Sequence, residues 1–418
     1  PILIISMNCS DPEKNSHTEM INILDFGTSK ICGISVVQDE NESKILGFSS
    51  IVTSGLKNGS IINMNETSRA VSLVLKDLEN QSCGKIKNIY TSFSGEQISS
   101  VNSLGQSEIL DKEVSYRDME KALRMSIAMD VPEDKRLLNV IPSHYIIDGQ
   151  SGILDPRGMS GVKLEVRRHL IYCPKNSISN ISKSIFDASR LRVKKFFFNQ
   201  LGAQRSVLSK DQLDSGVCLI DIGAGTTDLT ICKSGSMVFS KVFPYAGDYI
   251  TEALAMSLKI SSSQAEEIKK KYGSATAFEV EEENIKISGV QDLKEIIVSR
   301  RTVAEIIENA LSKILRSCMN CIDENGFKNN INAGIQITGG TANLQNIDKL
   351  GSSLFQTKFS IGMPCQNLPA NSEKIINPQY SSLIGMAKFC YEEEGKEFTF
   401  SQSKGIIARV LEWIRSEL

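Results

Sequence analysis

One stretch, residues 217–232, reads VCLIDIGAGTTDLTIC and constrains the fold more than any other part of the chain. An apolar run ends at Asp221, a turn rich in glycine and threonine follows, and an alternating apolar segment leaves. The N–H groups and hydroxyls of such a turn can converge on phosphate oxygens, and the strand-tip aspartate can hold a hydrated Mg²⁺. A plain hairpin is an equally good interpretation of this stretch alone. The candidate ligands are Asp221, Gly223, Gly225, Thr226 and Thr227.

The same pattern occurs a second time near the start of the chain. Residues 23–32 read ILDFGTSKIC, again an apolar strand, an aspartate, a glycine, hydroxyl residues and a strand. Internal repetition predicts two related half-domains that face one cleft, with Asp25 and Asp221 directed at the same Mg²⁺ and phosphate group. The candidate ligands of this copy are Asp25, Gly27, Thr28, Ser29 and Lys30.

A third element, residues 335–344, ends a strand in a double glycine and is predicted to open a helix, which would present backbone donors to a nucleotide. Its candidate ligands are Gly339, Gly340, Thr341 and Asn343. These three elements together resemble the superfamily of actin, sugar kinases and heat-shock chaperone ATPases. In that superfamily a Glu-x-x-Lys pair reaches the ribose and base, and the resemblance assigns this role to Glu266 and Lys269, with Gly247 also at the nucleotide.

Other nucleotide-binding patterns do not fit the chain. The run from Gly223 to Asp228 lacks the third glycine of a dinucleotide-binding turn and leads into a strand, and no Gly-x-x-x-x-Gly-Lys-Ser/Thr loop occurs. Lys plus Arg total 47 against 49 Asp plus Glu, without a basic cluster that interleaves aromatics, so the sequence does not indicate nucleic-acid binding. The ten cysteines are scattered, and Cys318 and Cys321 lie in a helical pattern typical of buried thiols rather than of zinc.

The length of 418 residues predicts two or more domains in an α/β fold. Residues 1–19 are expected to be a disordered extension without a secretory signal, which suits the cytosol. We expect the first half at 20–85, continued at 170–199 and 377–391, and the second at 200–248, continued at 330–376, with a subdomain at 249–329. An inserted α+β segment is predicted at 86–169, with a strand pair near 89–93 and 97–101 and a helix near 115–129.

A long helix is predicted over residues 301–322, since its apolar residues repeat at i, i+3 and i+4. Arg300 and Arg301 lie at its start, where positive charge is unfavourable with the helix dipole. Contact with a partner and simple solvation are equally good explanations of these two arginines. Asp248 is the predicted N-cap of an earlier helix. For His144 and His169, packing or hydrogen bonding is a better interpretation than metal binding, because no acidic or cysteine partner has suitable spacing.

The tail is predicted to consist of a polar linker, 392–403, and an amphipathic helix, 404–418. This helix is too short to span a bilayer, and its single Trp with arginines behind it favours an anchor at a membrane surface over packing onto the core. The apolar arc contains Ile406, Ile407, Val410, Leu411, Trp413 and Ile414.

From about residue 20 to residue 418 the chain resembles the FtsA family of bacterial cell-division proteins. The resemblance rests on the three nucleotide elements, the inserted text DPRGMSG at 155–161, the run RRTVAE at 300–305 and the terminal amphipathic helix. It implies an actin-like fold with an inserted subdomain, ATP and Mg²⁺ as ligands, and weak or no ATPase activity. It departs from the family at Phe26, where isoleucine is usual, and at 199–204, where the family has small residues.

The same resemblance implies what the protein works with. The expected partners are the C-terminal peptide of FtsZ at residues 249–329, the cytoplasmic face of the inner membrane at the division septum, other copies of the chain in a polymer, and later division proteins. Two alternatives stay open at this stage. They are an actin-like pilus-assembly adaptor, which is not expected to carry the terminal helix, and a small-molecule phosphotransferase, for which no catalytic base can be assigned.

Overall fold

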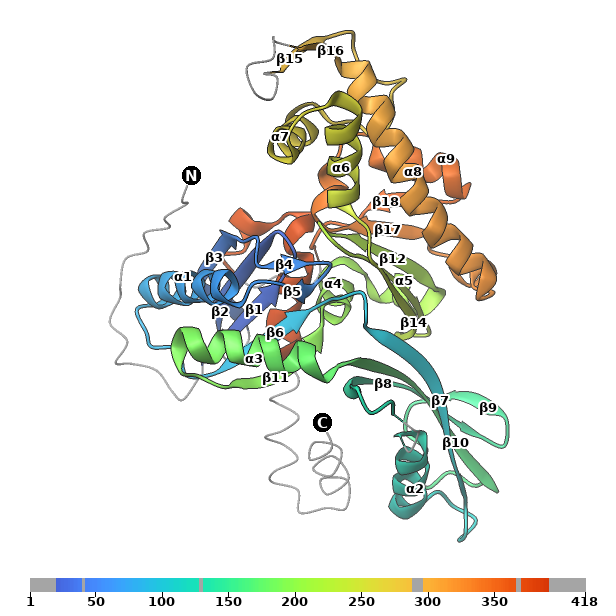
Figure 1. The fold of residues 1–418 in the computed structure, drawn as a ribbon. Helices are drawn as coiled ribbons and strands as arrows, with labels where there is room; N and C mark the ends of the chain where they lie inside the picture. The colour runs from blue at the N-terminus through green and yellow to red at the C-terminus, as the bar shows by residue number, and fades with distance from the viewer. Residues whose placement is uncertain (1–19, 40–41, 128–130, 288–295, 366–369, 391–418) are drawn as a thin grey trace.

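A computed structural model describes residues 20–39, 42–127, 131–287, 296–365 and 370–390. Figure 1 shows two central sheets, an inserted sheet with one helix, and a helical part, the last two at opposite ends of the molecule. The N-terminal extension, the polar linker and the terminal amphipathic helix predicted above lie outside the described residues. Within the described residues, no helix combines the length and the apolar character needed to cross a membrane.

The first sheet has the strand order β11-β6-β1-β2-β3. Its central strand β1 pairs antiparallel with β2, which pairs antiparallel with β3, while β6 and β11 run parallel to β1 on the other side. Helices α1 and α3 pack beside each other against it, and a two-stranded ribbon of β4 and β5 precedes α1. The bounds are β1 Ile21–Phe26, β2 Lys30–Asp39, β3 Glu42–Val52, β4 Leu56–Lys57, β5 Ser60–Ile61, α1 Met64–Ser82, β6 Ile89–Phe93, α3 Lys175–Ser189 and β11 Val193–Phe198.

The second sheet repeats this plan with the order β14-β13-β12-β17-β18. Strand β12 takes the place of β1, since it pairs antiparallel with β13 and parallel with β17. The predicted duplication is therefore confirmed at the level of strand topology. The bounds are α4 Asn199–Val207, α5 Lys210–Ser215, β12 Val217–Ile222, β13 Thr227–Lys233, β14 Ser236–Phe243, β17 Ile335–Thr338, α9 Ile347–Phe355 and β18 Phe359–Ile361.

The inserted part is a sheet of order β7-β10-β8-β9, with α2 packed on β7 and β10. Strand β6 is not part of it. The predicted pairing of residues 89–93 with 97–101 and the predicted start of the insert at 86 are both wrong, because β6 lies between β1 and β11 while β7 pairs with β10. The chain crosses from one sheet to the next over residues 94–98. The bounds are β7 Ser99–Glu108, α2 Tyr116–Ile127, β8 Lys135–Ile147, β9 Gln150–Ile153 and β10 Lys163–Pro174.

The helical part follows β14 and contains α6, α7, a β15–β16 hairpin and the long helix α8 (Figure 1). Helix α8 forms where the i, i+3, i+4 pattern predicts it, with its apolar stripe buried and Ser299 as N-cap accepting from the N–H of Thr302 at 3.1 Å. Asp248 is not the N-cap of α6; that position belongs to Ala246, and Asp248 lies in the first turn. The bounds are α6 Gly247–Leu258, α7 Ser262–Tyr272, β15 Asn284–Ile287, β16 Ile296–Ser299 and α8 Arg300–Glu324.

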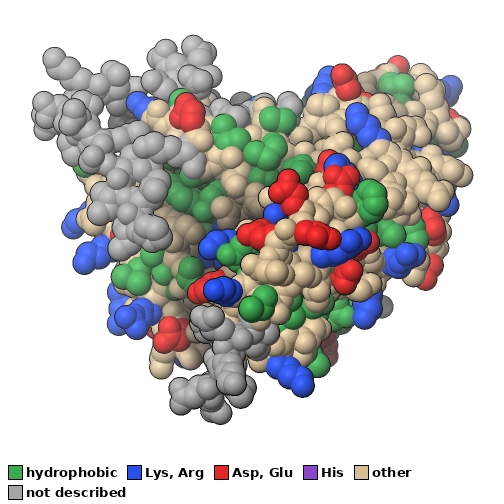
Figure 2. All heavy atoms as spheres, turned by 90° about the horizontal axis from the view of Figure 1, so that it is seen from above, with side chains coloured by type: hydrophobic (Ala, Val, Ile, Leu, Met, Phe, Trp, Pro, Cys, Tyr) green, Lys and Arg blue, Asp and Glu red, His purple; other side chains and the backbone are tan. Residues whose placement is uncertain are grey.

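Four short 3-10 turns complete the described chain: η1 Lys328–Asn330, η2 Gly340–Asn343, η3 Glu373–Ile375 and η4 Pro378–Tyr380. A last helix covers residues 381–390, and its apolar side chains belong to the core of the first half. That core also includes Val217 and Leu219 of the second sheet, so the two halves share buried apolar contacts. Figure 2 shows basic and acidic side chains interspersed over the face it presents.

Candidate functional site

The two repeated hairpins have the same geometry at their tips. In the first, the N–H of Gly27 donates to the carbonyl of Lys30 at 3.1 Å, and in the second the N–H of Gly223 donates to the carbonyl of Thr226 at 3.0 Å. Each turn directly follows a central strand whose penultimate residue is Asp25 or Asp221. The two carboxylates therefore occupy equivalent places in the two halves.

The hairpins approach each other closely. A Cβ placed on Gly225 would lie 2.5 Å from Thr28 Oγ1 of the opposite hairpin, so a side chain at this position would push the hairpins apart. Thr28 Oγ1 also accepts a hydrogen bond from the N–H of Gly59 at 3.1 Å. Only glycine allows this close approach.

The third element packs directly against the second hairpin. Gly339 has a φ of 87°, and a Cβ there would overlap the Asp221 carboxylate, so glycine is required on both counts. The hydroxyl of Thr341 donates to the carbonyl of Gly223 at 3.0 Å and ties the two elements together. The predicted helix after the double glycine is only the short turn η2, and α9 begins later, at Ile347.

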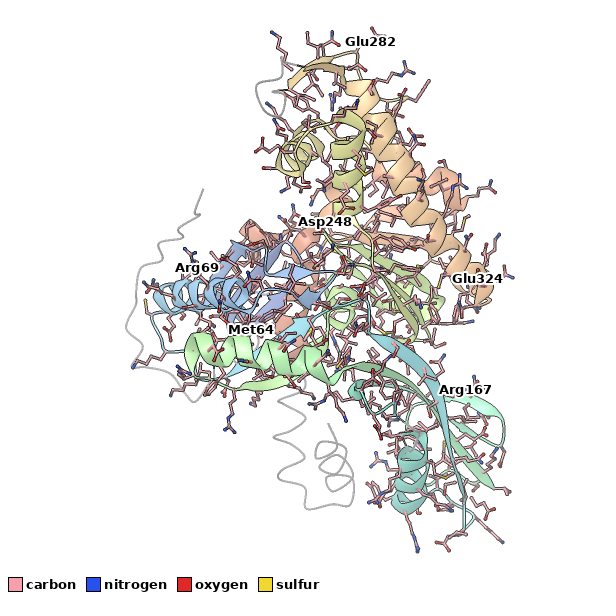
Figure 3. The ribbon with its side chains drawn as sticks, in the orientation of Figure 1. Met64, Arg69, Arg167, Asp248, Glu282 and Glu324 are labelled. Carbon is pink, nitrogen blue, oxygen red and sulfur yellow. The ribbon has the colours of Figure 1, made fainter. Side chains whose placement is uncertain are left out.

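All three elements line one cavity of about 830 Å³ between the halves. Of the predicted nucleotide ligands, only Thr227 does not reach it; its hydroxyl donates instead to the carbonyl of Tyr245 at 2.8 Å. Figure 3 labels Asp248, which also lines the cavity, where α6 meets the rest of the chain. The predicted residues that line it are Asp25, Gly27, Thr28, Ser29, Lys30, Asp221, Gly223, Gly225, Thr226, Gly247, Glu266, Lys269, Gly339, Gly340, Thr341 and Asn343.

Asp25 and Asp221 are half-buried in the wall of the cleft. Burial raises the pKa of Asp25 to about 6, against the opposing charge of Lys30. Burial and the nearby charge of Asp25 raise the pKa of Asp221 to about 6. A cation bound nearby would stabilise the ionised form of both carboxylates, whose ionisation their surroundings disfavour.

The carboxylates of Asp25 and Asp221 are the groups in this cavity that could hold a Mg²⁺ ion, one from each half. The residues described contain no group of three or more His, Cys, Asp or Glu side chains arranged to hold a metal ion. Mg²⁺ is commonly held by one or two carboxylates, with waters and phosphate oxygens completing its shell. Asp25 and Asp221 would be the protein ligands, and a bound cation would offset phosphate charge between the halves.

Sequence reasoning missed a polar network behind Asp221. Gln200 Nε2 donates to Asp221 Oδ2 at 3.3 Å and to Asp228 Oδ2 at 3.4 Å, and the Ser94 hydroxyl donates to Asp228 Oδ1 at 2.7 Å. Burial, followed by the charge of Asp221, raises the pKa of Asp228 to about 8. The sequence could have predicted one part of this network, because Asp228 is the cross-strand partner of Asp221 in the predicted hairpin. The approach of Ser94 and Gln200 depends on tertiary folding.

The predicted Glu-x-x-Lys pair forms on α7 and lines the cavity next to Gly247. Lys269 Nζ lies 2.6 Å from Glu266 Oε2, and it also donates to the carbonyl of Gly247 at 2.9 Å and the hydroxyl of Thr251 at 2.8 Å. Glu266 contacts Lys270 Nζ at 3.1 Å as well. The pair thus holds α7 against the start of α6 while facing the cleft.

Lys30 lines the cavity and contacts residues near the end of the described chain. Its Nζ donates to Gln379 Oε1 at 2.6 Å and lies 4.2 Å from the ring centroid of Tyr380. Burial lowers the pKa of Lys30. A phosphate would compete with Gln379 for this ammonium group.

The two arginines at the start of α8 have different surroundings. Arg300 is only 18% exposed, and it donates to the carbonyl of Tyr272 at 3.2 Å and to Gln345 Oε1 at 2.9 Å. Arg301 is 56% exposed, and its nearest carboxylate is that of Glu305 at 3.9 Å. Of the two, Arg301 is the more available to a partner.

His169 joins the insert to the second half, which agrees with the predicted hydrogen-bonding role. One ring nitrogen lies 2.7 Å from Asn102 Oδ1 on β7 and the other 2.9 Å from Ser240 Oγ on β14. The Asn102 amide and the Ser100 hydroxyl donate to β14 carbonyls at 3.0 and 2.8 Å. Burial lowers the pKa of His169 to about 4, so the ring is neutral.

Comparisons with known proteins agree with this architecture. The family description "Cell division protein FtsA" matches residues 218–385, and "SHS2 domain inserted in FTSA" matches residues 95–172. The chain is 32% identical over 387 residues to the FtsA of Pseudomonas aeruginosa, covering 92% of both chains. It is 33% identical over 407 residues to that of Neisseria meningitidis serogroup B, covering 95% of this chain and 98% of the relative.

Solved structures show the same fold at lower sequence identity. A PilM–PilN type IV pilus biogenesis complex contains a chain with a TM-score of 0.62 and 16% identity, covering 88% of this chain and 97% of that one. MreB5 of Spiroplasma citri bound to ADP has a TM-score of 0.56 and 16% identity, covering 92% and 99%. The fold is therefore actin-like, and the chain belongs to the FtsA family of bacterial cell-division proteins.

Proposed function

We propose that this chain binds ATP and Mg²⁺ in the cleft, polymerises on the cytoplasmic face of the inner membrane at the division septum, tethers FtsZ filaments there and helps to recruit later division proteins. One observation carries the nucleotide part. Two equivalent hairpins and the Gly339 turn line a single cavity, with one half-buried carboxylate from each half.

The chemistry of the cleft suits a nucleoside triphosphate. Backbone N–H groups, hydroxyls and Lys30 line the cavity, and the Glu266–Lys269 pair lines it from α7 next to Gly247, where it would meet the ribose and base. A solved relative of the fold is described as bound to ADP and another as bound to AMPPNP, which supports a nucleotide in the same place here. The membrane and FtsZ parts rest on family membership, on the amphipathic pattern of 404–418 and on the exposure of Arg301.

The carboxylates provide the test of the nucleotide part. Asp25→Asn and Asp221→Asn should each weaken Mg·ATP binding by about 1.5–3 kcal/mol, because each removes a charge-assisted contact to the hydrated cation. Titration calorimetry on the full chain measures this directly. Asp248→Asn is the matched control, since Asp248 lines the same cavity outside the carboxylate pair and its replacement should leave the affinity nearly unchanged. Equal affinities in wild type and both cation-site variants would end the proposal.

A further inference from the structure

The side chain of Gln379 is bound to the ammonium group of Lys30 inside the nucleotide cavity. Both residues line this cavity and both are half-buried. Lys30 Nζ donates to Gln379 Oε1 at 2.6 Å and lies 4.2 Å from the ring centroid of Tyr380. A charged donor makes this a charge-assisted hydrogen bond. The chain itself therefore supplies an acceptor to the ammonium group that is expected to meet phosphate.

The position of Gln379 is fixed, because the short turn η4 is held against the third nucleotide element. The N–H of Gln379 donates to Asn377 Oδ1 at 3.1 Å, and the Asn343 amide donates to the same oxygen at 3.1 Å. The carbonyl of Pro378 accepts from the N–H of Gly339 at 3.2 Å. These contacts hold the residues directly before Gln379, so its amide cannot follow the ammonium group if that group moves.

Lys30 differs from Gln379 in both its mobility and its need for a partner. Burial lowers the pKa of Lys30, and the nearby charge of Lys270 acts in the same direction. An ammonium group in such surroundings is less stable without an acceptor, so the bond to Gln379 stabilises the protein. The lysine stem is flexible, and a phosphate attracts its charge more strongly than a neutral amide does. A phosphate in the cavity would therefore draw the ammonium group away from Gln379.

We infer that Gln379 is an internal competitor of the nucleotide phosphates for Lys30 and thereby sets how tightly the cleft binds ATP. The inference rests on the proposed binding of ATP in the cleft. When the phosphate takes the ammonium group, part of the free energy of the new contact is used to break the old one. The amide is a determinant of affinity and takes part in no covalent step. Adenosine carries no phosphate, so it leaves the contact between Lys30 and Gln379 in place.

Two substitutions at position 379 test the inference, because they act in opposite directions. Gln379→Leu removes the acceptor and should tighten Mg·ATP binding roughly fivefold to tenfold, since the ammonium group no longer leaves a partner. Gln379→Glu places a carboxylate against Lys30 and should weaken binding about tenfold or more, through a stronger ion pair and repulsion of the phosphates. Titration calorimetry on the full chain measures both. A residue with only a structural role would lose affinity in both variants.

Three controls separate this role from other effects. Adenosine, measured by competition, should bind Gln379→Leu and wild type equally. Lys30→Met removes the contested ammonium group, so adding Gln379→Leu should not change Mg·ATP affinity further, which a double-mutant cycle measures. Gln106→Leu replaces an exposed glutamine on β7 of the insert and should bind Mg·ATP like the wild type.

Thermal unfolding gives a second readout. Nucleotide-free Gln379→Leu lacks the acceptor of Lys30, whereas the nucleotide complex does not use that acceptor. The rise in melting temperature on adding saturating Mg·ATP should therefore be larger in Gln379→Leu than in the wild type.

Mg·ATP binding that is unchanged or weaker in Gln379→Leu would overturn the inference, because Lys30 would then serve the amide and the phosphate together. A gain of the same size in the Lys30→Met background would also overturn it, since the effect would not act through the ammonium group. A wild type that binds no Mg·ATP would reject the nucleotide proposal itself. That result differs from wild-type binding that Gln379→Leu leaves unchanged.

Discussion

At the residue scale, Asp228 is a buried carboxyl group whose pKa lies far above its ordinary value. It is fully enclosed between Ser94, Gln200 and the Asp221 carboxylate, and its pKa of about 8 keeps it largely protonated at neutral pH. A protonated carboxyl can donate as well as accept, so it fits between two other polar groups without a buried charge. The folded state therefore holds a proton that the unfolded chain releases near pH 4.

This proton predicts a pH dependence. The folded pKa of Asp228 is raised above its unfolded value, so folding binds a proton, and the free energy of unfolding falls as pH rises toward 8. Between pH 6.5 and 8 the nucleotide-free protein should lose about 1–2 kcal/mol from this residue. His169 contributes with the opposite sign, because its ring is neutral in the folded state above about pH 4 while the unfolded imidazole is still about half protonated at pH 6.5. Its contribution over this window is only about 0.4 kcal/mol, so the fall caused by Asp228 remains.

Urea unfolding at several pH values measures the effect. Asp228→Asn replaces the carboxyl by an uncharged amide and should flatten the dependence over this window. Asp211→Asn on the short helix α5 serves as a control and should leave the dependence as in the wild type. A slope in Asp228→Asn equal to that of the wild type would show that Asp228 is ionised in the folded protein.

At the element scale, strands β7, β10 and β14 meet in a polar seam. His169→Phe would leave Asn102 and Ser240 without their ring partner, and we expect a loss of about 1–3 kcal/mol in the free energy of unfolding. His144→Phe is the matched control, because His144 lies on β8 and is less buried. Denaturant titration measures the free energy of unfolding of both variants. An equal loss of stability in the two variants would argue against a specific role for the seam.

Helix α8 presents a second element-scale prediction. Arg301→Glu should weaken binding of an FtsZ C-terminal peptide by about 1–2 kcal/mol, with strong dependence on salt, since an exposed attraction becomes a repulsion. Arg316→Glu, an exposed position nearer the other end of the same helix, is the control. A fluorescence titration in which both variants bind like the wild type at low and high salt would remove Arg301 from the peptide site.

The sequence predicted individual helices and hairpins better than the contacts between them. The repeat of Asp25 and Asp221 predicted two equivalent hairpins, because turn chemistry is local. The stretch 89–101 was misassigned, since two strands separated by a few residues look like a hairpin even when the chain crosses between sheets. The roles of Gln200 and Ser94 were not predictable, because each depends on a contact that forms only when distant parts of the chain fold together.

At the scale of the whole molecule, the predicted amphipathic helix at 404–418 is expected to determine whether the protein binds to the membrane. Trp413→Glu places a charge in the apolar arc of 404–418 and should release the protein from liposomes while Mg·ATP binding stays intact. One helix of this length binds reversibly, and its net charge near +1 gains about 1 kcal/mol from anionic lipid, so attachment should depend on many copies in one polymer. Co-flotation with liposomes measures this attachment. Arg415→Gln, which removes one charge outside the apolar arc, is the control and should have a smaller effect. Unchanged flotation of Trp413→Glu, or Trp413 fluorescence that does not shift to the blue with lipid, would refute the anchor.

The adjacency of β6 and β11 has a consequence for how the chain folds. These strands are neighbours in the first sheet, although Phe93 and Val193 are roughly a hundred residues apart. The insert between them brings its own ends together, because Ser99 pairs with Tyr172 where β7 meets β10. Once that pair forms, the path still to be closed is roughly a quarter as long, which lowers the entropy cost of closure by about 1 kcal/mol. An early-folding insert would thus speed completion of the first sheet, and a slow one would leave β6 exposed as an unpaired edge.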